Sequence, residues 1–153
     1  MTRSLLALPL AALVLTGCAG SGDLGQTAAE EAPGGETSAQ VEVSKDVTVL
    51  RASIADASDG ALDAGDDAVL RLDVQNAGPD DDTLQTVSGT GFGAVDAGPW
   101  TVPAEGVLHL GLDGTAAVVL PDTERPVAVG DEVEVTFVFD RSGEVTVTVP
   151  VTG

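Results

Sequence analysis

The only cysteine of the chain, Cys18, ends the segment Leu15-Thr16-Gly17-Cys18, directly after a short apolar run. Small residues before a cysteine let a signal peptidase approach the backbone closely, and the thiol can take a diacylglyceryl group. Cleavage would leave Cys18 as the first mature residue, and more than one acyl chain gives stable membrane anchoring. We therefore predict lipidation at Cys18; the alternative is an ordinary signal peptide with an incidental cysteine.

The segment before Cys18 has the composition of a signal peptide. Residues 1–17 carry one positive side chain, Arg3, followed by an apolar stretch interrupted by Pro9. A transmembrane helix needs about 20 apolar residues, and this stretch is shorter. We expect residues 1–17 to be removed and the mature lipoprotein to be extracytoplasmic, lipid-anchored at the cell surface or the periplasmic face.

The only histidine, His109, is the single imidazole that could bind a metal ion or transfer a proton. In Leu108-His109-Leu110 it alternates with apolar residues, so in a strand it would face solvent. It is either an ordinary surface histidine or a lone copper ligand helped by nearby carboxylates. The only methionine, Met1, would leave with the signal peptide, so the mature chain has no free sulfur ligand.

Two acidic clusters could supply oxygen ligands to a hard cation such as Ca²⁺. One is Asp80-Asp81-Asp82, and the other contains Asp63 with Asp66-Asp67. Neither matches the spacing of a Ca²⁺-binding loop. Aspartates beside Gly and Pro also stabilise turns by accepting hydrogen bonds from nearby backbone N–H groups. Both interpretations remain open from the sequence.

Motifs and charge together argue against several classes of protein. We find no Ser/His/Asp arrangement, no Gly-rich phosphate loop and no free nucleophilic cysteine, so we predict no enzyme and no resident cofactor. The formal net charge is −19, from 25 acidic and 6 basic residues. Such a surface repels nucleic acid and anionic lipid headgroups. The membrane contact we expect is therefore the lipid on Cys18.

Composition divides the mature chain into a linker and one folded domain. Residues 18–43 have few large apolar side chains and predict a flexible acidic, Gly-rich linker. Residues 44–153 show short β-branched runs separated by turn residues and no helical period, which predicts an all-β fold, an antiparallel β-sandwich or barrel. The expected strands are 47–54, 68–74, 83–88, 100–102, 107–110, 116–120, 132–139 and 144–151.

The order of several motifs resembles that of the PCu(A)C periplasmic copper chaperones. A strand reaches the turn Asn76-Ala77-Gly78, an acidic strand follows at Asp81-Asp82-Thr83-Leu84, and residues 102–108 and 126–151 continue the likeness. The resemblance covers roughly residues 47–151. It implies a cupredoxin-like sandwich, copper bound through histidine and methionine, and a role in copper handling and cytochrome oxidase assembly.

The copper ligands that the resemblance implies are missing. The family's C-terminal His-x-Met pair falls on Ala117 and Val119, and residues 89–99, where an upstream His and Met are expected, contain neither. The resemblance therefore implies a copper-chaperone-like domain with a degenerate copper site, which acts as a binding or scaffold module. The alternative is a surface β-sandwich unrelated to metals that binds a protein or cell-envelope partner.

Overall fold

The computed structural model describes residues 38–55 and 60–153, and this part of the chain is built from β-strands. None of the described residues belongs to a helix that is long and apolar enough to cross a bilayer. The all-β prediction is confirmed. The strands are β1 (Ala39–Glu42), β2 (Val47–Ala55), β3 (Ala61–Leu62), β4 (Ala68–Asn76), β5 (Asp82–Gly89), β6 (Trp100–Val102), β7 (Gly106–Leu110), β8 (Val118–Leu120), β9 (Val127–Ala128), β10 (Glu132–Phe139) and β11 (Gly143–Pro150).

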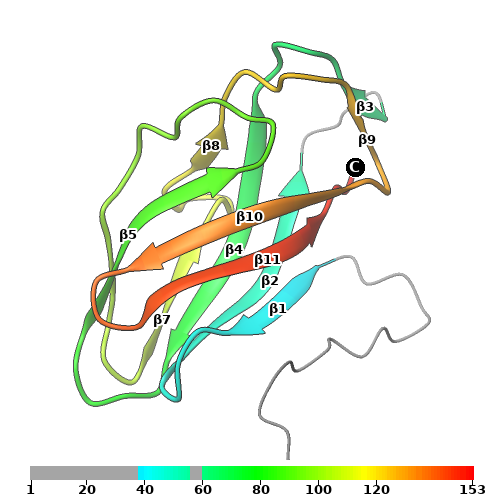
Figure 1. Ribbon diagram of the computed structural model, residues 1–153. Helices are drawn as coiled ribbons and strands as arrows, with labels where there is room; N and C mark the ends of the chain where they lie inside the picture. Colours follow the sequence, from blue (N-terminus) through cyan, green and yellow to red (C-terminus); the bar gives the residue numbers. More distant parts are fainter. Residues whose placement is uncertain (1–37, 56–59) are drawn as a thin grey trace, which may run out of the picture. The chain divides into compact units, whose positions relative to one another are not determined.

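Two antiparallel sheets form the layers of a β-sandwich. A five-stranded sheet has the order β1-β2-β4-β7, and β8 pairs with β4 beyond the end of β7. A four-stranded sheet has the order β11-β10-β5-β6, and the short strands β3 and β9 form a separate pair. In Figure 1, β10 and β11 of the four-stranded sheet cross in front of β2 and β4.

The core lies between the two sheets because the apolar residues of each strand alternate onto one face. In β4, Leu70, Leu72 and Val74 point inward, and in β10 Val135 and Phe137 do the same. The outward positions of β10 start with glutamates, as the alternation predicts. The buried cluster also contains Val47, Val49, Ala52, Ile54, Ala68, Leu84, Val87, Val102, Leu110, Val118, Leu120, Val127, Val133, Phe139 and Val149.

A hairpin at Arg141 and Ser142 joins β10 to β11. Phe139 pairs with Gly143, so three residues form the connection, and Gly143 has a φ of 90°. The chain thus enters β11 through a left-handed residue, a conformation that glycine adopts without a steric cost. Pro150 lies in β11, which is an edge strand, where its missing N–H leaves no ladder bond unmade.

The first strand lies inside the range that we assigned to the linker. β1 pairs with β2, and Ala39 and Val41 pack against the core, so this end of the linker belongs to the sheet. β1 is only four residues long and includes a Gln and a Glu. So short a stretch shows too little alternation to be distinguished from a linker. The two-residue strands β3 and β9 were also not predicted, because so short a segment has no period.

Candidate functional site

The predicted site residues lie in different parts of the chain. Cys18 lies outside the residues that the structure describes, so its lipidation stays a prediction. His109 lies in β7, and Ala117 and Val119 lie immediately before β8 and within it. The structure therefore allows the two candidate metal positions to be compared with each other.

His109 faces outward from the five-stranded sheet, as its alternation predicts, but it is not isolated. Its ring Nδ1 lies 2.5 Å from Oδ1 of Asp73, its register partner on β4. The guanidinium of Arg51 on β2 makes an ion pair with the other carboxylate oxygen. Three adjacent strands thus bring an arginine, a carboxylate and a histidine together.

The burial of this cluster is unequal. The side chain of Asp73 is 3% exposed, whereas those of Arg51 and His109 are 69% and 48% exposed. A buried carboxylate is costly unless charged or polar groups pair with it, and here the two outer side chains cover it from solvent. A carboxylate accepts hydrogen bonds, so Nδ1 of His109 carries the proton and Nε2 is left free on the ring's other side.

Arg51 reaches Asp73 because β2 is irregular at this point. The register of β2 against β4 shifts between Leu50 and Ser53, and Arg51 has a φ of 51°. A bulge re-aims one side chain of a strand. A left-handed backbone is unfavourable for a residue other than glycine, by about 1 kcal/mol or more. This unfavourable conformation occurs at Arg51, the residue that covers Asp73.

The positions matched to the family's copper ligands form a different region. Ala117 and Val119 are exposed, and the segment after β8 meets the loop after β5 through a hydrogen bond of 2.7 Å from Gly93 N–H to Pro121 O. The structure thus places the loop where an upstream His and Met were expected beside the end of β8. Neither segment contains a soft sulfur or imidazole donor.

His109 cannot complete a site in that region. It pairs with Asp73, whereas Val119 pairs with Val69, four residues earlier on β4. Four residues of a strand span about 13 Å, which is too far for an imidazole to share a metal ion with the β8 positions. Within residues 38–55 and 60–153, no group of three or more His, Cys, Asp or Glu side chains could hold a metal ion.

Aspartates of both acidic clusters accept hydrogen bonds from backbone N–H groups. Asp66 accepts a hydrogen bond from the N–H of Asp63, Asp67 from that of Asp122, and Asp81 from that of Ala104. These carboxylates hold neighbouring backbone segments together. Of these three contacts, the one between Asp63 and Asp66 is local, as the turn interpretation expects, whereas those of Asp67 and Asp81 join segments that are 55 and 23 residues apart.

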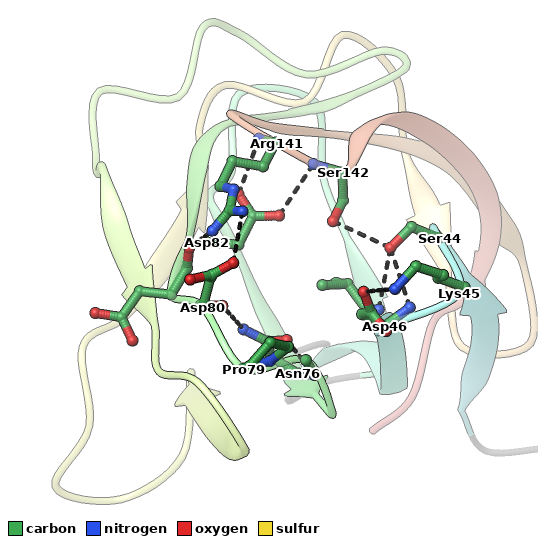
Figure 2. Close-up of a pocket in the computed structure, with 12 residues that line it drawn as sticks. Ser44, Lys45, Asp46, Asn76, Pro79, Asp80, Asp82, Arg141 and Ser142 are labelled. Carbon is green, nitrogen blue, oxygen red and sulfur yellow. Dashed lines mark hydrogen bonds and ion pairs between the residues drawn. The ribbon is translucent and has the colours of Figure 1, made fainter.

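A polar pocket lies where three turns meet, between residues 44–47, residues 76–82 and the β10–β11 hairpin. Figure 2 shows Asp80 and Asp82 opposite Ser44 and Lys45, with Arg141 and Ser142 on the hairpin side. Arg141 pairs with Asp80 at 2.9 Å, and Ser44 bonds Ser142 at 3.1 Å. These contacts tie the three turns to one another.

Asp82 is the centre of this pocket. Its carboxylate accepts hydrogen bonds from the N–H groups of Thr83, Arg141 and Ser142, at 2.7 to 3.0 Å. Burial by itself would raise the pKa of Asp82, but hydrogen bonds from the Ser142 hydroxyl and from these three N–H groups outweigh it. The pKa of Asp82 therefore lies below its ordinary value of 3.8.

The motif that carried the family resemblance is part of this network. Asn76 Oδ1 accepts from the N–H of Gly78, and its Nδ2 donates to the carbonyl oxygens of Asp80 and Val102. Together with Asp82, this asparagine fixes the β4–β5 turn and connects it to β6. The motif is structural and contains no metal ligand, so it can persist in a chain whose copper ligands are absent.

Sequence reasoning did not identify Arg51 and Asp73. The alternation of β4 puts Asp73 on the outward face with Arg71, where its burial is not expected from the sequence. Nothing local indicated that β7 would pair with β4 and bring His109 opposite Asp73. The bulge at Arg51 gave no signal either, because its sequence contains no Gly.

Comparison with known proteins supports the fold. The chain is similar to the structure titled "Copper-bound PCuAC domain from PmoF2" at 23% identity and a TM-score of 0.65, over 75% of this chain and 98% of that one. It is similar to the "Apo PCuAC domain from PmoF1" at 23% identity and a TM-score of 0.65, over 75% and 99%. The predicted PCu(A)C resemblance and the β-sandwich are thus confirmed at the level of the fold.

The sequence comparisons identify the family. No curated protein matches the chain. Residues 45–151 match the family described as "Putative lipoprotein LpqE-like", which covers nearly the whole described domain. The chain therefore belongs to the LpqE-like lipoprotein family, and its domain has the fold of PCuAC domains.

Proposed function

We propose that this protein is a lipid-anchored extracytoplasmic binding module, a PCuAC-like domain that has lost its copper site and acts on a protein partner. The observation that carries the proposal is the set of donors at the family's copper positions, where Ala117, Val119 and the loop after β5 offer neither thioether nor imidazole. Cu(I) prefers such soft donors. The proposal assigns no catalysis to the domain and keeps the family link to copper handling as its context.

Copper binding tests the loss of the site. We expect residues 19–153 to bind Cu(I) more weakly than micromolar in competition with a chelator, because one imidazole is the only soft ligand in this range. The double variant Ala117→His/Val119→Met restores the family's His-x-Met pair at two exposed positions, and we expect it to bind Cu(I) measurably more tightly than the parent.

Ala117→Gln/Val119→Leu is the matched control, because it introduces side chains of similar size without a soft donor. It should behave like the parent. Tight stoichiometric binding by the parent that His109→Ala abolishes would contradict the proposal, since it would mean that His109 anchors a site shared between chains.

The lipid anchor is proposed from Cys18, which follows the apolar run of residues 1–17. We expect the full-length protein in its host to fractionate with membranes and the Cys18→Ala variant to lose its acyl chains, measured by mass spectrometry of the isolated protein. Cys18→Ser should give the same result, because neither side chain provides a thiol. Membrane retention of unacylated variants would contradict this mode of anchoring.

A further inference from the structure

The edge strands of the two sheets differ in how far they are protected against pairing with another strand. β1 carries Glu42 and a bulge, β6 and β8 are three residues long, and β7 is five residues long. Short edge strands, charged side chains and bulges all hinder the addition of a further strand. β11 is eight residues long and pairs with β10 in a register without any shift. It is the longest regular edge in the described part of the chain.

The sequence of β11 favours strand addition over most of its length. Glu144, near its start, is its only charged residue, and Pro150 ends it. Residues 145–149 between them alternate valine and threonine, which both have high β-propensity. The chain has a formal net charge of −19, so this uncharged stretch is a place where two copies can approach without bringing carboxylates together.

Every second residue of β11 directs its backbone groups away from β10. Val151 N–H donates to the carbonyl oxygen of Asp131 at 2.9 Å, and this pair continues the register of β10 and β11. Hydrogen-bonded and non-hydrogen-bonded pairs alternate along an antiparallel ladder. Counting back from Val151, the residues that point their N–H and C=O groups to the edge are Glu144, Thr146 and Thr148.

A contact between two hydroxyl groups agrees with this assignment. Oγ1 of Thr146 lies 2.8 Å from Oγ1 of Thr136, its register partner, and side chains lie closer in non-hydrogen-bonded pairs. Within residues 38–55 and 60–153, the edge-directed groups of β11 have no backbone partner. β1 of the other sheet lies close to β11 (Figure 1) but pairs with β2. A row of free N–H and C=O groups is a template for a further strand.

The inward side of this edge is also incompletely covered. Val145 and Val147 pack against the core but are only half-buried, whereas Val149 is fully buried. A strand added beside β11 would place its own inward residues next to these two valines and remove more of their apolar surface from water.

We propose that β11 pairs antiparallel with β11 of a second copy across a two-fold axis at Thr146. Glu144 then lies opposite Thr148 of the second copy and Thr146 opposite Thr146, so every edge-directed N–H and C=O group gains a partner. On the inward side Val145 lies opposite Val147 and packs against it. The two Glu144 side chains are separated by four residues along the paired strands, about 13 Å, which limits their repulsion. The same strand thus satisfies backbone, apolar and charge requirements when it meets itself.

The size of the contact makes the dimer weak. An eight-residue strand is about 26 Å long, and a width of about 10 Å gives about 300 Å² per copy. A stable complex buries roughly 800 Å² per partner. The dimer is therefore expected at high protein concentration. Copper and the lipid take no part in this contact, so it is independent of the proposed function.

Sedimentation equilibrium of chain 19–153 between about 20 µM and about 1 mM tests the pairing. We expect the mean mass to rise from monomer toward dimer and no further, because a two-fold contact uses the β11 edge of both copies. Raising the salt from about 50 mM to about 0.5 M should strengthen the dimer, since both copies carry net negative charge. In NMR spectra of ¹⁵N-labelled protein, concentration-dependent amide shifts should concentrate on β11.

Thr146→Glu should weaken the dimer at least about tenfold, because it places two carboxylates opposite each other at the axis. Thr136→Glu is the matched control. It adds the same charge to the same face and removes the same Thr136–Thr146 hydrogen bond, but it lies one strand further from the axis. It should weaken the dimer less than about threefold.

Thr146→Pro tests the backbone contribution. The N–H of Thr146 takes no part in the ladder with β10, so this variant should keep a dispersed NMR spectrum and lose the dimer. A parent chain that stays monomeric at the highest concentration would overturn the proposal. Species larger than a dimer, shifts located away from β11, or equal losses from Thr146→Glu and Thr136→Glu would overturn it too.

Discussion

Gly111→Ala is expected to destabilise the domain by about 3 kcal/mol, measured by denaturant unfolding. Gly111 follows β7 directly and has a φ of 73°, where a side chain costs about 1–2 kcal/mol. A Cβ there would also overlap the carbonyl oxygen of Leu70 and lie 3.0 Å from the Cα of Arg71. Both are backbone atoms of β4 and cannot move aside, so overpacking adds about 1–3 kcal/mol.

Gly114→Ala separates the two contributions. Gly114 lies in the same connection between β7 and β8 and has a φ of 81°, but a Cβ there has no atom within 4 Å. We expect this variant to lose about 1 kcal/mol, the backbone cost by itself. Equal destabilisation by the two substitutions would show that Gly111 does not approach β4 as closely as the structure indicates.

Asp82→Ala is expected to cost about 2–4 kcal/mol of unfolding free energy. It removes the acceptor of three backbone N–H groups, those of Thr83, Arg141 and Ser142, and partly buried donors without partners cost about 1–3 kcal/mol each. Because these donors belong to β5 and the β10–β11 hairpin, the loss would loosen two turns at once. Asp81→Ala, which frees one exposed N–H of Ala104, should cost much less.

Asp82 also makes stability depend on pH in a defined direction. Its folded-state pKa is lowered, so its contribution is complete above its ordinary value of 3.8 and is lost as pH falls through the lower folded pKa. Asp82→Asn should therefore be less stable than the parent at neutral pH and lose less stability on acidification below about pH 4. Parallel stability curves for the two proteins over this range would contradict the assignment.

The motif that carries the family resemblance contributes to the fold through hydrogen bonds at turns. Asn76 accepts a hydrogen bond from the N–H of Gly78, and Asp82 accepts one from the N–H of Arg141, so both side chains satisfy backbone groups at turns. Ligand positions such as Ala117 and Val119 are exposed and bear no core packing. Substitutions at these two positions are therefore expected to leave the sandwich folded.

The sequence by itself determined the all-β class, most strand positions and the lack of histidine and methionine at the positions matched to the family's copper ligands. Alternation such as Val133-Glu134-Val135 is local, because each residue's direction follows from its neighbour's. The identity of the residues at the matched positions needs no structure, since folding cannot supply a histidine or a methionine that Ala117, Val119 and residues 89–99 lack. β1 was missed because four residues carry too weak a period.

Only the tertiary structure decided which outward residues meet. Arg51, Asp73 and His109 are separated by 22 and 36 residues along the chain, and they join through the pairing of β2, β4 and β7. Strand pairing depends on the packing of the whole core, and the bulge that turns Arg51 toward Asp73 depends on the register of β2 against β4. No local pattern encodes the strand pairing or the bulge, because each results from contacts between segments that are remote in sequence.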